Sequence, residues 1–302
     1  MKPKVALVLS CGGARGMAQI GVIEELEKAG FEISSVAGSS IGSVVGGIYA
    51  AGKLEEFTHW VKNLDKLNVY KLMDFSVTKS GFIRGDKVFK ELHKFIPDSN
   101  IEDLPIPFVA VAADLIKRKE EVISRSSLFQ AIRSSIAIPG VIVPNKVNGT
   151  NLVDGGVIEP VPIDFVQRIE GDILVVVDLN AKGNYDPPQI NNSNIGKKEL
   201  QYDKLVKRIR IKLGFPKEHD FMDTMKFGYF DILYSSITLM QEKLSQRTIA
   251  MHKPDILVQI PRTACKTFEF YRATELIEAG RAEFKKELIK WEEEQKAISK
   301  TT

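Results

Sequence analysis

Apolar and polar positions follow two recurring patterns over the first fifty residues of the chain. Residues 5–9 form an unbroken apolar run, which predicts a buried strand. Over residues 17–29 the apolar positions recur at helical spacing and Gly30 follows as a stop signal, so a helix is expected there. A short strand at 36–37 and a helix at 41–51 repeat this order. The succession strand–helix–strand–helix is typical of an α/β fold with a mainly parallel sheet.

The rest of the chain continues with the same two patterns, and residues 173–179, ILVVVDL, give the strongest strand signal. Residues 181–196 interrupt them, because they are polar and rich in Asn, Pro and Gly, which indicates a loop or an insertion. We expect one domain over 1–302, with a polar and basic insertion around 181–222. The other expected strands are 108–113, 121–124 and 256–260, and the other expected helices are 54–66, 86–95, 128–134 and a long, charged C-terminal helix around 273–296.

The basic segment KKELQYDKLVKRIRIK, residues 197–212, follows the polar loop. A helix there would carry apolar residues on one face and most of its cations off that face. A solvated surface helix is the favoured interpretation. A contact with a membrane surface stays open as the alternative, and it would use Lys204, Lys207, Arg208 and Arg210.

Composition and charge exclude several classes of protein. The 302 residues include 42 basic and 39 acidic ones, and the net charge of +3 is too balanced to indicate nucleic acid binding. Two cysteines, Cys11 and Cys265, argue against a disulfide framework and for a reducing compartment, so a cytoplasmic location is expected. The run at 5–9 is shorter than the roughly 7–15 apolar residues of a signal peptide. The charge-free stretch 33–52 is as long as a membrane span, but its first half is rich in Ser and Gly.

That stretch contains Gly38-Ser39-Ser40-Ile41-Gly42, which fits the pattern G-x-S-x-G. In this pattern a serine lies at a sharp turn from a strand into a helix, where flanking side chains would collide with neighbouring backbone. The N-terminus of the following helix favours developing negative charge at the serine. A strand is expected before the pattern and a helix after it, so Ser40 is a candidate nucleophile and Gly38 and Gly42 are the glycines of the turn.

A nucleophilic serine needs donors for an oxyanion, and a second glycine-rich stretch, SCGGARG at residues 10–16, follows the first strand. Gly12 and Gly13 can present N–H groups without a side chain in the way, and Arg15 can brace the loop or add positive charge. Both loops leave the carboxyl ends of strands, where α/β sheets place their sites. Two alternatives stay open: a plain tight turn, and a dinucleotide-binding loop whose first glycine is replaced by Cys11.

Candidates for the general base fall into two groups. The four histidines stand in polar or charged context, which is typical of surface residues; they are His59, His93, His219 and His252. Asp154 follows the apolar pair Leu152-Val153 and precedes two glycines, so it is a candidate acid at the end of a strand, and an Asp-Gly hairpin turn is the equal alternative. Asp114 and Asp178 also end predicted strands and are weaker candidates.

Taken together, these elements resemble the bacterial branch of the patatin-like phospholipase family over most of the chain, from Val5 nearly to Ala282. The block LSCGGARGMAQIGV is similar to the family's glycine-rich oxyanion block, GSSIG to its nucleophile elbow, and DGG at 154–156 to its acid motif. The stretches SSIAIPGVIVP, residues 134–144, and ATELIEAG near the end of the chain also resemble the family.

The resemblance implies a three-layer α/β/α sandwich with a mainly parallel central sheet, and a Ser–Asp dyad that works without histidine. In it Ser40 would attack an acyl ester carbonyl, Asp154 would take the proton, and the N–H groups of Gly12 and Gly13 with Arg15 would hold the oxyanion. The expected substrate is a lipid or phospholipid, cleaved in the manner of a phospholipase A or a lysophospholipase. No metal and no cofactor are implied, and a peripheral membrane contact stays open.

Two positions depart from the family pattern: Cys11 replaces the first glycine of the run, and Gln19 stands where a histidine is common. Gln19 lies outside the dyad, whereas Cys11 bears on the geometry of the oxyanion loop. Two further functions stay open beside the lipid hydrolase. One is a catalytically weak or inactive protein that binds lipid or serves as a scaffold, and the other is an esterase with a Ser-His-Asp triad.

Overall fold

The computed structural model describes residues 2–78, 81–147, 149–188 and 229–299. The chain divides into two compact units, one made of Met1–Pro188 with Met240–Thr302 and the other of Gln189–Leu239. The central sheet and the candidate site belong to the first unit. The basic segment 197–212 lies outside the described residues, and the expectation of a single domain with an insertion stays a prediction.

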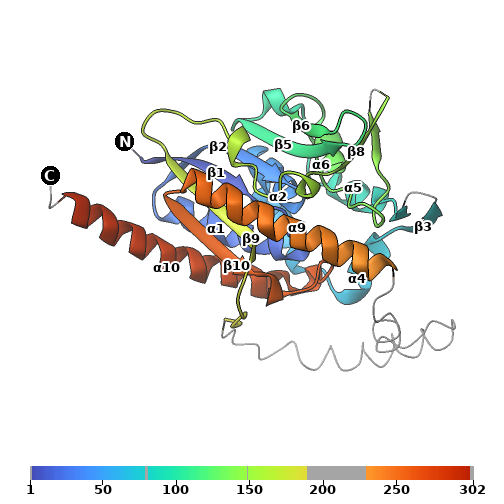
Figure 1. The fold of residues 1–302 in the computed structure, drawn as a ribbon. Helices are drawn as coiled ribbons and strands as arrows, with labels where there is room; N and C mark the ends of the chain where they lie inside the picture. Colours follow the sequence, from blue (N-terminus) through green and yellow to red (C-terminus); the bar gives the residue numbers. More distant parts are fainter. Residues whose placement is uncertain (1, 79–80, 148, 189–228, 300–302) are drawn as a thin grey trace. The chain divides into compact units, whose positions relative to one another are not determined.

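A sheet of eight strands runs through the first unit and confirms the predicted α/β class with a mainly parallel sheet (Figure 1). The strands lie in the order β10-β9-β1-β2-β5-β8-β7, with β6 paired to β5. The parallel strands are β1 (Lys4–Leu9), β2 (Glu32–Ser39), β5 (Phe108–Asp114), β9 (Ile173–Ala181) and β10 (Ile256–Pro261). The antiparallel strands are β6 (Lys119–Ile123), β7 (Asn145–Val147) and β8 (Thr150–Asp154).

Both faces of the sheet are covered, which gives the three layers that the family resemblance implies. On one face Leu7 and Leu9 of β1 share a core with α1 (Met17–Lys28), α2 (Ile41–Ala50) and α10 (Ala273–Ser299). On the other face Ala6 and Val8 share a core with the segment 161–166 and with Ile249 of α9 (Tyr229–His252). Alternate residues of β1 therefore enter two separate cores, as expected for a strand buried on both faces.

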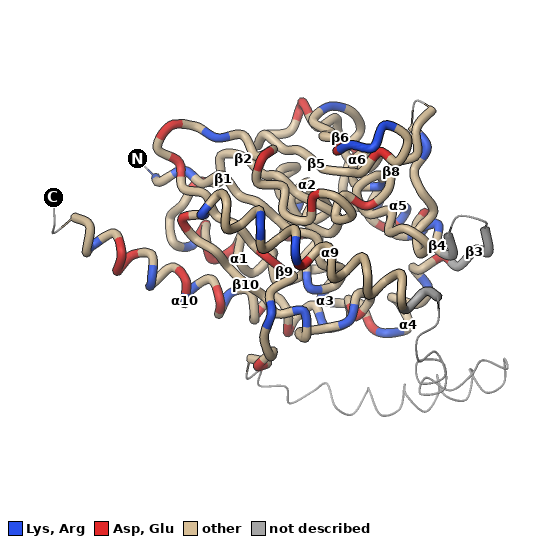
Figure 2. Tube along the Cα trace, in the orientation of Figure 1, with Lys and Arg blue, Asp and Glu red and all other residues tan. Residues whose placement is uncertain are grey.

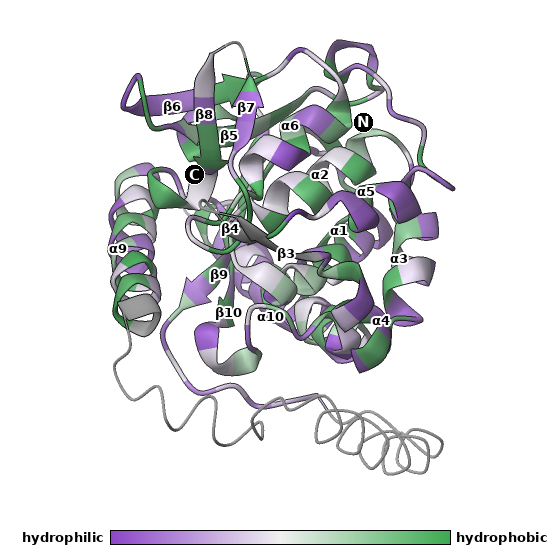
Figure 3. Cartoon of the chain, turned by 90° about the vertical axis from the view of Figure 1, so that its right-hand side faces the viewer, coloured by the Kyte–Doolittle hydropathy of each residue, from purple (hydrophilic) through white to green (hydrophobic). Residues whose placement is uncertain are grey.

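The helix α2 has no strongly hydrophilic position and is buried along its whole length (Figure 3). Two of its glycines allow close packing: a Cβ on Gly46 would lie 2.8 Å from Cγ1 of Val36, and one on Gly47 would lie 2.8 Å from Cδ1 of Leu128 in α6 (Leu128–Ser135). The small residues of the stretch 33–52 thus serve packing, and the stretch is divided between β2 and α2. Among the described helices, none has the length and hydropathy that a membrane crossing needs.

The sequence patterns locate most elements within a few residues, including α5 (Asp86–Leu92). The helix expected at 54–66 is confirmed as α3 (Leu54–Lys62) but ends earlier than expected, and a separate helix that the patterns do not indicate, α4 (Lys66–Leu72), begins at Lys66. Asp65 begins the second helix by accepting a hydrogen bond from the N–H of Asn68. The patterns also give no sign of α9, of β7, or of the short pair β3 (Phe75–Thr78) and β4 (Gly81–Ile83).

The C-terminal helix α10 is confirmed as long and charged. Basic and acidic residues alternate along it (Figure 2), and ion pairs one turn apart join them, such as Lys286 with Glu283 at 2.8 Å. One face of its first half is buried, and there Gly280 packs so closely against α1 that a Cβ on it would lie 1.9 Å from the carbonyl oxygen of Ala18.

Candidate active site

Ser40 occupies the turn between β2 and α2, with φ 53° and ψ −122°. Positive φ is strained for a residue with a side chain, and two glycines make the turn possible here. A Cβ on Gly38 would lie 2.3 Å from the carbonyl oxygen of Gly42, and one on Gly42 would lie 2.1 Å from that of Leu9. Close backbone contacts therefore require both glycines, which confirms the sharp turn that G-x-S-x-G predicts.

Asp154 is the last residue of β8 and lies opposite Ala112 of β5. Ser40 Oγ donates a hydrogen bond to Asp154 Oδ2 at 2.5 Å, and the N–H of Gly156 donates to Asp154 Oδ1 at 2.8 Å. The residues after Asp154 form a 3-10 turn, η3 (Gly155–Val157), so the hairpin interpretation of the Asp-Gly pair is wrong. The structure thus brings the predicted serine and the predicted acid into direct contact across 114 residues of sequence.

Both partners are buried, with Ser40 6% and Asp154 4% exposed. Burial raises the pKa of Asp154 from its ordinary value of 3.8 to about 6, and the hydrogen bonds from Ser40 and Gly156 oppose that rise. A carboxylate with a raised pKa is a stronger proton acceptor, and at pH 7 it is still mostly ionised. Asp154 therefore combines the position and the basicity that a general base for Ser40 needs.

The predicted oxyanion loop follows β1 and enters a 3-10 turn, η1, that begins at Gly13. Gly13 has φ 59°, and a Cβ there would lie 2.7 Å from the carbonyl oxygen of Thr267, so this position requires glycine. The N–H of Ala14 donates to the same oxygen at 2.8 Å. Within the part of the chain that the structure describes, the N–H groups of Gly12 and Gly13 have no protein acceptor. Gly13 and Ser40 both line one cavity, and the role of the two N–H groups as oxyanion donors stays a prediction.

Arg15 belongs to this loop and is 5% exposed. Its Nε donates to the carbonyl oxygen of Leu179 at 2.9 Å, and its Nη1 donates to that of Cys265 at 3.1 Å. These bonds join the loop to the end of β9 and to the chain after β10. They account for the bracing that the sequence predicts, whereas a direct contact of Arg15 with an oxyanion stays a prediction.

Asn180, near the end of β9, orients the loop and was not indicated by any sequence pattern. Its Nδ2 donates to the carbonyl oxygen of Cys11 at 2.9 Å, and Ser10 Oγ donates to the same oxygen at 3.2 Å. The C=O of Cys11 and the N–H of Gly12 belong to one trans peptide and point in opposite directions. Fixing the carbonyl therefore also fixes the direction of the Gly12 N–H.

Ser135, from α6, supports the nucleophile turn in a similar way. Its Oγ accepts a hydrogen bond from the N–H of Ser40 at 2.9 Å and donates to the carbonyl oxygen of Val111 at 2.6 Å. Its only signal in the sequence is its place in the block SSIAIPGVIVP. On the other side of the turn, Ser43 Oγ donates to the carbonyl oxygen of Ser40 at 2.6 Å.

Cys11 fits the loop without the backbone strain that would require glycine. The described non-glycine residues with positive φ are Ser40, Asp74, Arg118, Ser126 and Lys253, so Cys11 is not one of them. Its N–H donates to the carbonyl oxygen of Pro160 at 2.9 Å. Burial, and next the nearby Asp154, raise the pKa of the Cys11 thiol to about 12, so the thiol stays protonated and is a poor nucleophile.

The other candidate bases lie apart from Ser40. His59 is beside Asn63, His93 packs edge-on against Phe129 with ring centroids 4.5 Å apart, and His252 Nε2 lies 3.0 Å from Asp164 Oδ1. His219 lies outside the described residues. Asp114 accepts hydrogen bonds from Thr150 Oγ1 and from two backbone N–H groups, and these bonds hold its pKa at about 2. Asp178 accepts a hydrogen bond from the N–H of Asn180.

Among the described residues, no three His, Cys, Asp or Glu side chains cluster as a metal site would need.

An apolar cavity of about 160 Å³ opens beside Ser40 and Gly13. It lies among α2, α3, α4 and α5, and none of the described residues that line it is charged. The side chains facing it include Val44, Phe57, Trp60, Val61, Leu72 and Phe268. A cavity of this kind suits a hydrocarbon chain and gives no partner to a charged group.

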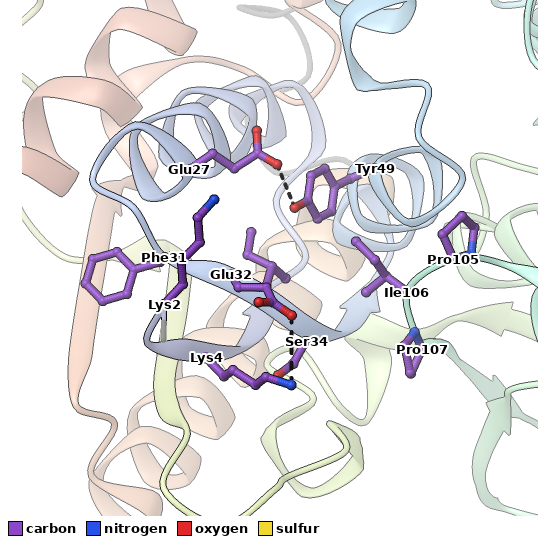
Figure 4. Close-up of a pocket in the computed structure, with 11 residues that line it drawn as sticks. Lys2, Lys4, Glu27, Phe31, Glu32, Ser34, Tyr49, Pro105, Ile106 and Pro107 are labelled. Carbon is purple, nitrogen blue, oxygen red and sulfur yellow. Dashed lines mark hydrogen bonds and ion pairs between the residues drawn. The ribbon is translucent and has the colours of Figure 1, made fainter.

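A second hollow, of about 570 Å³, lies at the amino ends of β1 and β2, at the edge of the sheet opposite Ser40 (Figure 4). Four of its polar side chains form two pairs: Lys4 Nζ lies 3.8 Å from Glu32 Oε1, and Tyr49 Oη donates to Glu27 Oε1 at 2.9 Å. Because these groups satisfy one another, the hollow offers no reactive group comparable to the pair at Ser40.

Comparison with protein families matches residues 7–166 to the family described as Patatin-like phospholipase. An uncharacterized NTE family protein of Mycobacterium tuberculosis is 35% identical over 93% of this chain and 90% of its own length. Patatin-like phospholipase domain-containing protein 6 of Homo sapiens is 30% identical over 60% of this chain and 14% of its own length. Lysophospholipase NTE1 of Phaeosphaeria nodorum is 28% identical over 64% of this chain and 13% of its own length.

Among solved structures, VipD from Legionella pneumophila is similar over 96% of this chain and 67% of that one, with a TM-score of 0.47 and 14% sequence identity.

Proposed function

The chain belongs to the patatin-like phospholipase family, and from this premise we propose that it is a serine hydrolase that cleaves carboxyl esters of lipids. One observation carries the proposal. Ser40 Oγ donates directly to Asp154 Oδ2 at 2.5 Å, beside an apolar cavity. This arrangement pairs a nucleophile with a base and gives an acyl chain a place to lie.

In the proposed first half-reaction, Ser40 Oγ bonds to the ester carbonyl carbon and its proton passes to Asp154 Oδ2. The carbonyl electron pair moves onto oxygen, where the N–H groups of Gly12 and Gly13 and the N-terminus of α2 stabilise the negative charge. The ester C–O bond then breaks, and Asp154 returns the proton to the leaving alcohol. An acyl group remains on Ser40.

In the proposed second half-reaction, Asp154 takes a proton from water, and the water oxygen attacks the acyl carbonyl carbon. The same donors hold the second oxyanion. The bond to Ser40 Oγ breaks, the fatty acid leaves, and Ser40 regains its proton from Asp154. Arg15 acts in this scheme by bracing the loop and adds positive charge close to it, while Asn180 and Ser135 hold the donors and the nucleophile in place.

The substrate we propose is a phospholipid or lysophospholipid cleaved at its acyl ester. The uncharged lining of the cavity favours an acyl chain inside and a polar head group outside. A related protein of Phaeosphaeria nodorum carries the name lysophospholipase, which is consistent with a substrate of this class. The cytoplasmic location and the absence of a metal or cofactor stay predictions from the sequence.

The two alternatives to this proposal have less support. An inactive lipid-binding or scaffold protein would not require both Ser40 and Asp154, yet the two are intact and hydrogen-bonded. A Ser-His-Asp esterase would place a histidine between serine and acid, and the described histidines contact other residues.

The proposal is tested by assaying a panel of phospholipids and lysophospholipids with wild type, Ser40→Ala and Ser39→Ala. Ser39 is the matched control, because it is the neighbouring buried serine and its Oγ has no partner among the described residues. We expect Ser40→Ala to lose roughly three or more orders of magnitude in rate, about 4 kcal/mol of barrier, and Ser39→Ala to stay within about tenfold of wild type. Equal activity of Ser40→Ala and wild type would refute the proposal.

A further inference from the structure

The turn between β5 and β6 exposes two neighbouring aliphatic side chains next to three cations. Residues 115–119 read LIKRK, and all five are exposed. Leu115 is 54% and Ile116 is 59% exposed, so both side chains lie largely in solvent. Single exposed apolar residues are ordinary, whereas two adjacent ones at the apex of a hairpin, followed directly by Lys117, Arg118 and Lys119, form a small amphipathic tip.

The tip is held firmly by the end of β5. Asp114 Oδ1 accepts hydrogen bonds from the N–H groups of Ile116 and Lys117, each at 2.9 Å, and from Thr150 Oγ1. The N–H of Arg118 donates to the carbonyl oxygen of Asp114 at 2.9 Å. Asp114, a weaker catalytic candidate in the sequence, therefore serves to shape this turn. These hydrogen bonds fix the backbone that carries the exposed side chains.

The register of the sheet puts the tip beyond the edge at which the nucleophile lies. Ser39, the residue before Ser40, lies opposite Val111 in the parallel pair of β2 and β5. Leu115 follows Val111 by four residues, which corresponds to about 13 Å of extended chain past the level of Ser39. On the other edge of β5, Ala112 lies opposite Asp154. The tip and the Ser40–Asp154 pair thus share the carboxyl edge of the sheet, and the tip protrudes from it.

The three cations of the tip differ in whether they are paired within the chain, and this decides which of them can contact a ligand. Lys117 Nζ lies 3.4 Å from Asp114 Oδ2 and 3.9 Å from Glu121 Oε2, so that cation is largely balanced within the chain. Arg118 and Lys119 form no ion pair with the described residues. The acids Glu120 and Glu121 lie further from the apex, along β6, and both are less exposed than the tip.

We propose that residues 115–119 dock the protein on an anionic lipid surface, with Leu115 and Ile116 entering the acyl region and Arg118 and Lys119 contacting phosphate groups. This rests on the proposed function, since a lipid hydrolase must meet its substrate at such a surface. Two aliphatic side chains on a narrow turn cover far less than the roughly 800 Å² per partner of a stable protein interface. Insertion into lipid needs no complementary surface, and phosphates complement the cations.

The test is flotation with vesicles, carried out in the Ser40→Ala background so that no lipid is consumed. Vesicles of phosphatidylglycerol and phosphatidylcholine are compared with vesicles of phosphatidylcholine alone. We expect Leu115→Ser with Ile116→Ser to weaken binding at least about tenfold on the mixed vesicles. Arg118→Gln with Lys119→Gln should lower it about tenfold or more at low salt, and much less at high salt, because exposed charges are screened.

The matched control is Ile289→Ser with Ile298→Ser on α10, which removes two isoleucines that are 57% and 60% exposed. It should bind vesicles like the parent, and thermal unfolding of every variant checks that it is folded. Binding that is unchanged in both tip variants, or reduced equally in the α10 control, overturns the proposal.

A different experiment would refute the proposed function, independently of the vesicle binding. If Ser40→Ala, alone, hydrolyses a water-soluble short-chain ester as fast as wild type, the hydrolase assignment is wrong whatever the vesicles show. If that ester requires Ser40 while the tip variants bind vesicles normally, only the docking proposal is wrong.

Discussion

Ser40 is held at positive φ by its surroundings, and a non-glycine residue in such a conformation costs of the order of 1–3 kcal/mol. The motifs around Ser40 and Asp154 could be predicted because the turn chemistry demands small residues at fixed spacing. Ser135 and Asn180 could not, because each is a single polar residue whose partner comes from another element, 95 and 169 positions away. Their roles depend on tertiary contacts that leave no local pattern.

The raised pKa of Asp154 leads to a prediction about activity. A general base must be ionised to accept a proton, and the pKa of Asp154 is about 6 in the folded protein. The kcat/KM for a water-soluble ester should therefore rise with pH through about 6 and level off above 7. A pH–rate profile between pH 4.5 and 8.5, at temperatures where the protein stays folded, measures this. A profile that is already flat from pH 4.5 would show that Asp154 does not act with a raised pKa.

The same raised pKa leads to a prediction about stability. Asp154 binds a proton more tightly when folded, with a pKa of about 6 against 3.8 when unfolded, so stability falls as pH rises between those values. Above pH 6 the buried charge costs on the order of 3 kcal/mol. Asp154→Asn should then stabilise the protein by up to that amount at pH 8 and by little at pH 4, although the proposed dyad predicts that it loses hydrolysis. Urea unfolding at both pH values measures the difference, and a variant less stable than wild type at pH 8 would contradict this.

Cys11 and Gly13 should respond differently to substitution, because the two positions have different backbone conformations. Cys11 does not have positive φ, so Cys11→Gly should keep kcat/KM within about tenfold of wild type, under about 1.4 kcal/mol. Gly13 has φ 59° and no room for a Cβ, so Gly13→Ala should displace a donor and lose about a hundredfold or more. Steady-state kinetics on the folded variants measure both values of kcat/KM and so test the two expectations. A folded but inactive Cys11→Gly, together with turnover by Ser40→Ala, would make the cysteine the nucleophile.

Among the secondary-structure elements, apolar periodicity indicated the central parallel strands and the helices packed on them. It could do so because β1, β9 and α2 are buried along nearly their whole length. The same reasoning misses α9, because the hydrophobic positions of this helix do not mark one buried face. Five large apolar residues of its described part are exposed: Ile232, Tyr234, Leu239, Met240 and Met251. It also extends α3 past its end at Lys62 and does not indicate α4, whose start at Lys66 is capped by the single polar residue Asp65.

The helix α4 should help to set the preferred acyl length. Leu72 lines the cavity beside Ser40, whereas Tyr70 of the same helix is 54% exposed and does not line it. Leu72→Trp should fill part of the cavity and lower kcat/KM for a dodecanoyl ester at least about tenfold relative to a butanoyl ester. Tyr70→Trp is the matched control and should keep the wild-type ratio. The same chain-length profile in both variants would show that acyl chains lie elsewhere.

For the whole molecule, the sequence indicates an α/β fold of one family, and the structure adds the contacts that turn separate motifs into one site. Ser40 and Asn180 lie at the carboxyl ends of the parallel strands β2 and β9, which meet at one edge of the sheet. Asp154 joins them from the antiparallel strand β8, whose pairing with β5 places it opposite Ala112 near that edge. The single-domain organisation and the membrane contact of residues 197–212 stay predictions. Replacing Lys204, Lys207, Arg208 and Arg210 with Gln in the flotation assay would separate that segment from the tip at 115–119.

Covalent labelling of Ser40 tests the central claim most directly, because it reports the nucleophile without requiring knowledge of the substrate. A fluorophosphonate reacts with an activated serine, and mass spectrometry of the digested protein locates the adduct. We predict one adduct, on Ser40, in wild type and in Ser39→Ala, much slower labelling in Asp154→Asn, and none in Ser40→Ala. An adduct on another residue, or labelling of Ser40 that proceeds at the wild-type rate in Asp154→Asn, would contradict the proposed dyad.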